Sequence, residues 1–318
     1  MSLRLLQEAD LSAPYWQPWL EWFSPVPNLT LEPAGQVAEY LNHIKPDTLA
    51  KHFVPQDDLP SAMAYESYIA LEDRIPTRDG LHDFLNGLCW FAFPRTKAHF
   101  NQLHQEQIAR LGTQARGRVR DMLTVLDENG FLIQAPDPLW DALQAKQWYT
   151  AFVELRPLWQ DTQVMVFGHA LLEKLVSPYK AITAHALRIP NDIKLHAQHD
   201  KCPQSKSPSA LISVDVLSAE ATCKETRDTR ESLTQKSTQI FQRQYLPILD
   251  DFLREYLSED RLLTKPYIPI QIFGIPGWSK EQEQADFYDD KQVFRPPRMA
   301  AKTLQAEKTT ASIKSRGF

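Results

Sequence analysis

The chain has 318 residues, of which 43% are hydrophobic and 24% are charged, and its formal net charge at pH 7 is -5. This composition excludes an intrinsically disordered chain, because such chains lack the apolar residues that build a core. The negative net charge disfavours a protein that coats nucleic acid through bulk electrostatics, although a local basic patch would remain compatible with it.

The first 23 residues contain an aromatic segment, YWQPWLEWF. It places Trp16, Trp19 and Phe23 at helical spacing, which predicts a single apolar stripe along a helix. We interpret this stripe as part of the core. The alternative is an exposed surface that contacts a partner.

The segment RDGLHDFLNGLCWFAFPRTK contains the clearest helical pattern. Apolar residues recur at helical spacing from Leu81 to Cys89, and aromatic residues then widen the apolar face as far as Phe93. This pattern predicts a central helix that Pro94 interrupts. A second helix is expected to follow and to end at Gly112.

The strand signals come later in the chain. TVLDENGFLI contains an Asn-Gly pair between short β-prone runs, which predicts a hairpin turn near Asp127 and Gly130. AITAHALRI and YIPIQIFGI predict two further strands, whereas residues 137–153 and 240–257 have helical periodicity. Together, the helical and strand patterns predict a mainly helical α+β protein with a small sheet.

We expect residues 1–297 to form a single globular domain. Within it, residues 197–239 are polar and rich in Ser, Thr and Lys, which predicts a surface insertion. Residues 298–318 lack large apolar clusters and carry scattered charge, so we expect a disordered tail.

The cysteines and the hydropathy indicate a location. Cys89, Cys202 and Cys223 form no CxxC pair, and an odd number of cysteines describes neither a disulfide framework nor a zinc cage. We therefore expect the reducing environment of the cytoplasm. The N-terminus lacks the apolar stretch of a signal peptide, and no apolar run approaches the roughly 20 residues of a membrane-spanning helix.

Polar residues on the predicted central helix suggest a site. His82 and Asn86 are four residues apart and share a helical face. Because an unpaired buried polar group costs about 1 to 3 kcal/mol, these side chains either bond to neighbouring backbone groups or line a cleft.

His169 and Glu173 repeat this spacing in FGHALLEKL. Such a pair offers a helical face with an imidazole and a carboxylate, suited to a metal ion or to a base oriented by an acid. A satisfied buried pair is the structural alternative. His185, in a predicted strand, would be a third member if that strand runs beside the helix.

A discontinuous set of cations could contact phosphate. Arg95 and Lys97 stand at the start of the second predicted helix, and RGRVRD adds three arginines. We favour the alternative that they are solvated faces that pair with nearby acids, and RGRVRD lacks the interleaved aromatic residues that stack bases. The chain has no P-loop, GxSxG, HExxH or Rossmann motif.

Five ordered segments carry a resemblance. They are PTRDGLHDFLNGLCWFAFPRTK, RGRVRDMLTVLDENG, VFGHALLEKLVSPYKAITAHA, FGIPGW and FYDDKQVFRP. Together they resemble the bacterial domain of unknown function 3025 family, from about Tyr65 to Pro297. The resemblance implies no activity, cofactor or catalytic residue, but its segments contain His82, His169, Glu173 and His185.

These observations support two hypotheses of function. The first is an enzyme in which the His, Glu and Asn side chains converge on one polar pocket, with His169 as base or metal ligand, Glu173 as its partner and Arg95 or Lys97 as an anion contact. Its reaction would be hydrolysis, metal-assisted or not, of a small or phosphorylated substrate. The second is a non-catalytic protein that binds a protein or nucleic-acid partner. The sequence names no cofactor and no partner.

Overall fold

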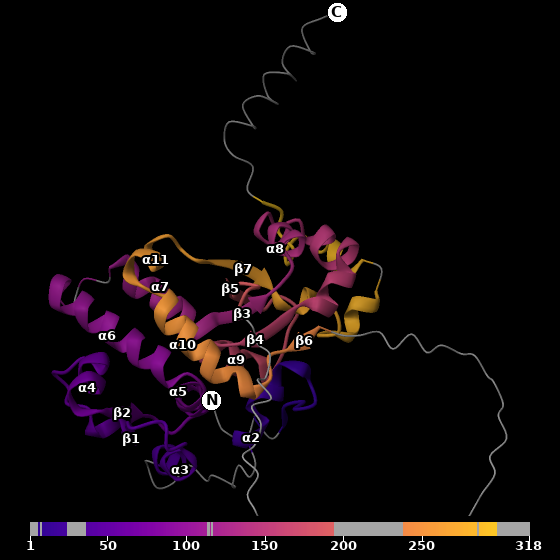
Figure 1. Ribbon diagram of the computed structural model, residues 1–318. Helices are drawn as coiled ribbons and strands as arrows, with labels where there is room; N and C mark the ends of the chain where they lie inside the picture. The colour runs from indigo at the N-terminus through magenta and orange to yellow at the C-terminus, as the bar shows by residue number, and fades with distance from the viewer. Residues whose placement is uncertain are drawn as a thin grey trace, which may run out of the picture. The chain divides into compact units, whose positions relative to one another are not determined.

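The computed structural model describes residues 6, 8–23, 36–112, 115, 117–193, 238–284 and 286–297 (Figure 1). These residues belong to one compact unit, Met1–Leu195 together with Ser237–Phe318. The unit combines numerous helices with a two-stranded and a five-stranded sheet, which confirms the predicted α+β class.

The larger sheet is built around β3 (Gly130–Gln134), whose three apolar residues are all buried. A run of consecutive buried apolar residues is typical of a strand covered on both faces. β4 (Gln163–Val166) pairs with β3 antiparallel, and β5 (Thr183–Arg188) pairs with it parallel. The edges are β6 (Gln239–Ile240), parallel to β4, and β7 (Tyr267–Gln271), antiparallel to β5. The strands predicted in AITAHALRI and YIPIQIFGI are therefore confirmed.

The predicted hairpin near Asp127 and Gly130 is wrong. Helix α7 (Arg118–Asn129) runs through Asp127, and β3 starts directly after it and pairs with strands much later in the chain. Gly130 has a φ of -66°, so it does not form a left-handed turn. A Cβ at this position would lie 2.4 Å from the carbonyl oxygen of Leu126, so glycine permits a tight passage from helix to strand.

The two predicted helices around Pro94 are confirmed. α5 (Leu81–Ala92) is buried along most of its length, and α6 (Pro94–Leu111) begins at the proline, which suits the first turn of a helix. α6 ends before Gly112, whose φ is 78°. The first turn of α6 is capped from α10 (Leu246–Tyr256), because Asp250 accepts hydrogen bonds from the backbone N–H groups of residues 95 and 96 at 3.0 and 2.8 Å.

The start of α9 (His169–Leu175) lies against the end of α7. A Cβ at Gly168 would come within 2.4 Å of the backbone carbonyl group of Glu128, so only glycine allows the two helices to approach this closely. α9 also packs along α5. These two contacts bring the helix that carries His169 beside the helix that carries His82.

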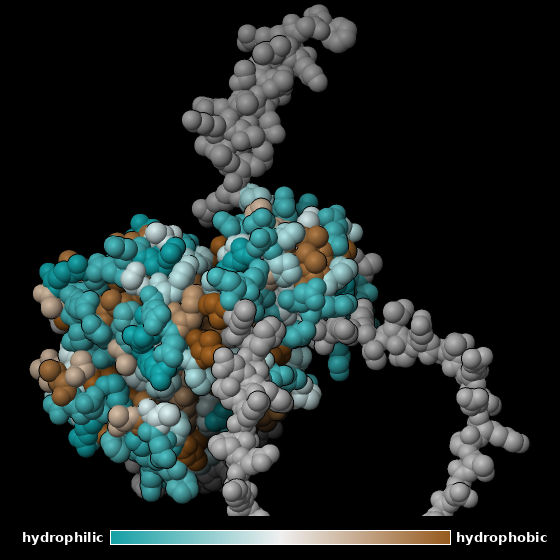
Figure 2. Space-filling model, viewed as in Figure 1, coloured by the Kyte–Doolittle hydropathy of each residue, from teal (hydrophilic) through white to brown (hydrophobic). Residues whose placement is uncertain are grey.

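The aromatic N-terminal segment belongs to the core, as we interpreted it. It forms a 3-10 helix, η1 (Pro14–Trp19), and a helical turn, α2 (Leu20–Phe23). Trp16 and Trp19 are fully buried, and Phe23 is 6% exposed. The surface seen in Figure 2 is mostly hydrophilic, with hydrophobic residues in separate groups.

The remaining elements complete the unit. The smaller sheet consists of two parallel strands, β1 and β2, with α3 and α4 beside them. The bounds are α3 (Gln36–Ile44), β1 (His52–Pro55), η2 (Gln56–Asp58), α4 (Tyr65–Glu72), β2 (Arg74–Thr77), α8 (Asp137–Gln144), the π-helical turn η3 (Thr150–Glu154), η4 (Arg156–Asp161), η5 (Arg243–Tyr245), α11 (Glu259–Leu263), η6 (Ile272–Gly274), η7 (Lys280–Glu283) and η8 (Phe287–Asp289).

Two predictions concern segments outside the described residues. The proposed insertion at 197–239 is described only at its last two residues, of which Gln239 is in β6, and the proposed tail at 298–318 is not described. Within the part of the chain that the structure describes, every helix is too short or too polar to cross a membrane.

Candidate functional site

A polar pocket of about 450 Å³ lies among α4, α5, α6, α7 and the start of α9, and we call it the histidine pocket. This volume suits a small molecule. Its lining residues are Gln56, Leu59, Tyr65, Glu66, Arg78, His82, Asp83, Asn86, His104, Thr124, Asp127, Glu128 and His169.

Two predicted site histidines meet in this pocket. The Nε2 atoms of His82 and His169 are 3.2 Å apart, and their ring planes are inclined by 79°. The Nδ1 atom of His82 is 2.8 Å from Oε2 of Glu173. His169 and Glu173 share a face of α9, as their spacing predicted, and both contact the same imidazole from α5.

These contacts determine where the protons can lie. When Glu173 is ionised and both histidines are neutral, His82 Nδ1–H donates to Glu173, which leaves a lone pair on His82 Nε2, 3.2 Å from His169 Nε2. The single proton of the neutral His169 ring then lies on Nδ1, 3.7 Å from Oδ2 of the Asp127 carboxylate, and Nε2 of His169 also carries a lone pair. A proton gained by His82 can therefore be shared with His169, between carboxylates at either end.

Burial keeps His169 neutral in the resting protein. It lowers the pKa of the His169 imidazole to about 4, although the Asp127 carboxylate opposes this change. Lys97 and His82 add to the depression of the pKa. His82 differs in its surroundings, because 38% of its side chain is exposed, against 7% for His169. His82 is consequently the more accessible of the two rings.

Lys97 is buried behind the pocket lining and contacts two of the lining residues. Its side chain is 5% exposed, and its Nζ atom donates to Oδ1 of Asn86 at 2.8 Å and to Oδ1 of Asp127 at 2.5 Å. Burial would raise the pKa of Asp127, but the charge of Lys97 and the neighbouring His169 outweigh this effect and hold the pKa below its ordinary value. Lys97 thus balances a protein carboxylate, and its charge is not free for a substrate anion.

His185 does not line the histidine pocket. It lies on β5, and its ring packs edge-on against Tyr267 with a centroid distance of 5.3 Å. Burial lowers its pKa to about 4. The prediction that His185 converges with the other two histidines is therefore wrong, because β5 directs this ring to β7.

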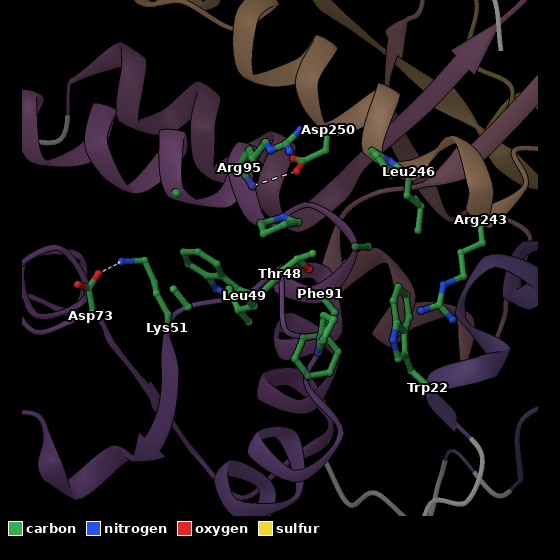
Figure 3. A pocket seen from close by; sticks show the side chains of 17 residues that line it. Trp22, Thr48, Leu49, Lys51, Asp73, Phe91, Arg95, Arg243, Leu246 and Asp250 are labelled. Carbon is green, nitrogen blue, oxygen red and sulfur yellow. Dashed lines mark hydrogen bonds and ion pairs between the residues drawn. The ribbon is translucent and has the colours of Figure 1, made fainter. Parts of the chain in front are cut away.

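Arg95 lines a different pocket, which is larger at about 640 Å³ and mainly apolar (Figure 3). Arg95 forms an ion pair with Asp251 at 2.5 Å, and Trp22 and Phe91 line the same pocket. No histidine lines it, and its acidic residues Asp73 and Asp250 are engaged in hydrogen bonds. The histidine side chains that line the two pockets consequently lie in the smaller one.

Several pocket residues escaped the sequence analysis. Asp127 was assigned to a turn, yet the apolar residues Val119, Leu123 and Leu126 continue a helical period up to it. His104 lies seven residues, or about two helical turns, after Lys97 on α6, so the shared face could have been recognised. Tyr65 had no signal in the sequence; burial, followed by neighbouring carboxylates, raises its pKa well above the ordinary value.

A metal ion would need more ligands than the two histidines. Across residues 6–297, as far as the structure describes them, no group of three or more His, Cys, Asp and Glu side chains is arranged to hold one. His82 and His169 offer only two nitrogen ligands side by side, because Glu173 is hydrogen-bonded to Nδ1 on the opposite side of the His82 ring.

The comparison with known families agrees with the resemblance in the sequence. Residues 51–298 match the family described as "Protein of unknown function (DUF3025)". This range contains the whole histidine pocket together with Glu173 and Lys97. Comparisons with curated proteins and with solved structures find no match. Because the match extends over most of its length, the chain belongs to the DUF3025 family.

Proposed function

We propose that this protein is an enzyme that uses His82 as a general acid–base group on a small polar substrate in the histidine pocket. The observation that carries the proposal is the chain of contacts from Glu173 through His82 to His169. A carboxylate that accepts from one ring nitrogen selects the tautomer and leaves the other nitrogen basic. His82 has this environment and is also exposed to the pocket.

The reaction that we propose is hydrolysis. His82 Nε2 would take a proton from an attacking water molecule as its oxygen bonds to the substrate, and would return that proton to the leaving group. During the step, Glu173 stabilises the imidazolium form of His82, and His169 offers a second nitrogen to share the proton. Asp127 and Lys97 hold His169 in place from the buried side.

A test needs both an activity readout and one that does not depend on the substrate. In a panel of small esters, amides and phosphoesters, hydrolysis by the wild-type protein should fall roughly 10²- to 10⁴-fold in His82→Asn. Glu173→Gln should lower it as well. His43→Asn, at an exposed position on α3, is the matched control and should retain the wild-type rate.

The second readout is the tautomer of His82 in the wild-type protein. Nitrogen NMR should find His82 protonated on Nδ1 and bare on Nε2 near neutral pH, and Glu173→Gln should weaken this preference. Full hydrolytic activity in His82→Asn, or a proton resting on Nε2 of His82 in place of Nδ1, would refute the proposal.

The alternative is a non-catalytic binding protein, which would contact its partner through an exposed aromatic segment or a basic face. Trp16, Trp19 and Phe23 are buried, which counts against contact through the aromatic segment. Arg95, a member of the basic set, is paired with Asp251, which counts against contact through the basic face. The cytoplasm remains the proposed compartment, on the grounds of the cysteine pattern.

A further inference from the structure

The charges that line the histidine pocket are unequal. Four carboxylates line it, those of Glu66, Asp83, Asp127 and Glu128, against a single guanidinium, that of Arg78. Behind this lining, Lys97 adds one positive charge and Glu173 adds one negative charge, which leaves the imbalance unchanged. The pocket therefore has an excess of three negative charges when its histidines are neutral.

Internal ion pairs account for only part of this excess. Asp83 is paired with Arg78, whose Nε and Nη2 atoms donate to it at 3.1 and 2.9 Å. Asp127 is paired with Lys97. Glu66 and Glu128, by contrast, have no ion pair with a lysine or arginine among the residues that the structure describes.

Glu66 is held at a defined position in the wall. Asn101 donates through Nδ2 to the carbonyl oxygen of Glu66 at 2.8 Å and to its carboxylate at 2.7 Å. This amide satisfies one carboxylate oxygen without neutralising the charge. A carboxylate fixed in this way presents a preorganised charge to the pocket.

The imidazole of His104 lines the same pocket as Glu66. His104 is 9% exposed and lines the pocket, and its Nδ1 atom is buried without a hydrogen-bond partner within the described part of the chain. It shares a face of α6 with Asn101 and Lys97, three and seven residues before it. A buried polar group without a partner is uncommon in folded proteins, and a ligand bound in the pocket would supply the missing partner.

We propose that the histidine pocket binds a small organic cation, a primary ammonium or a guanidinium group, through Glu66 and Glu128 with His104 beside it. The proposal deepens the function proposed above and rests on it, because this cation would be the recognition group of the substrate. It also replaces a phosphorylated substrate, since a phosphate would add negative charge to a pocket that already has an excess. The volume of about 450 Å³ fits an amine of a few carbon atoms.

Three probes of one size separate charge from shape. n-Butylammonium, butan-1-ol and butyrate have similar chains and carry positive, zero and negative charge. Ligand-observed NMR with the full chain should detect n-butylammonium at least roughly tenfold more tightly than either of the others, and this affinity should fall as salt is added. Inorganic phosphate should not compete with it.

Variants locate the binding groups. Glu128→Gln and Glu66→Gln should each weaken n-butylammonium binding by roughly three- to tenfold. Glu106→Gln, an exposed position on α6 outside the pocket, is the matched control and should leave the affinity unchanged. Glu66→Gln could fail to fold, because Glu66 is hydrogen-bonded to Asn101. In that case the affinity of Glu128→Gln alone tests the proposal, since the Glu128 side chain has no hydrogen bond within the described residues.

The outcomes separate this inference from the proposed function. Binding that is retained in His82→Asn, while hydrolysis is lost, supports both. Hydrolysis that depends on His82, with equal affinity for all three probes, overturns the cation site and leaves the acid–base function standing. Tight binding of Mn²⁺ that excludes n-butylammonium also overturns it, since the carboxylates would then hold a metal ion.

Discussion

The buried ion pair between Lys97 and Asp127 offers the sharpest test of how the histidine pocket is built. Lys97→Met removes the charge and keeps a flexible chain of similar length. The Lys97 side chain is 5% exposed, and that of Asp127 is 26% exposed. The variant would leave the Asp127 carboxylate beside His169 without its principal cation, and would leave Asn86 without its donor.

The magnitude follows from the geometry. At the 2.5 Å between Lys97 Nζ and Asp127 Oδ1, two unit charges attract by about 7 kcal/mol at an effective dielectric constant of 20, which is an upper bound. Desolvation of both charges offsets much of this attraction, but removal of one partner from a buried pair costs about 3 to 5 kcal/mol. Because Asp127 keeps some contact with solvent, we expect a loss near the lower value, about 3 kcal/mol.

The assay is urea unfolding at pH 7, with a double-mutant cycle. Lys97→Met and Asp127→Asn should each lower the free energy of unfolding by about 3 kcal/mol, and the double variant should lose much less than their sum. Arg95→Met is the control on the same helix, because its pair with Asp251 is exposed and should contribute less than about 1 kcal/mol. A loss below about 1 kcal/mol in Lys97→Met, or additive losses in the double variant, would refute the reasoning.

The same pair predicts the behaviour in acid. The pKa of Asp127 in the folded protein lies below its ordinary value of 3.8, so its ionised form contributes stability above that value. This contribution is lost as the pH falls below about 4 and through the folded pKa. Asp127→Asn should show a flatter loss of stability below pH 4 than the wild-type protein.

Three further predictions concern His169 and the contacts that fix helices α9 and α6. The pKa of His169 falls from 6.5 to about 4 on folding, so the unfolded chain takes up the proton first as the pH is lowered. The free energy of unfolding should therefore fall between pH 6.5 and pH 4, by up to about 3 kcal/mol. In urea unfolding, His169→Asn should show a smaller loss over this pH range than the wild-type protein. Gly168→Ala would force a Cβ against the backbone of Glu128, which cannot move aside; we expect a loss of about 3 kcal/mol in urea unfolding, and an unchanged stability would contradict the close approach. Asp250→Asn weakens the cap that accepts from the N–H of Thr96, and should lower the free energy of unfolding by about 1 to 2 kcal/mol, whereas no change in thermal or urea unfolding would show that the cap is dispensable.

Local patterns in the sequence were sufficient for much of the fold. The helical period and Pro94 placed α5 and α6 correctly, because a proline restricts its own backbone and that of its predecessor wherever it occurs. The Asn-Gly pair misled for a related reason. Its turn preference is a local property, but the apolar period of α7 and the tight contact at Gly130 outweighed it.

The histidine pocket shows the same division. Spacing along a helix established that His82 shares a face with Asn86, and His169 with Glu173, since these relations depend only on helical geometry. Only the packing of α9 on α5 decided that His82 contacts both His169 and Glu173, although it stands 87 and 91 residues before them in the chain.

The roles of the remaining candidates were decided by tertiary structure alone. His185 was correctly assigned to a strand, but strand periodicity does not state which neighbour its ring meets, and that neighbour is Tyr267. Arg95 and Lys97 are two residues apart on α6, so they point in different directions, one to an exposed pair with Asp251 and one into the buried network. Which charge is free for a ligand depends on partners that come from distant segments, and the sequence by itself does not identify them.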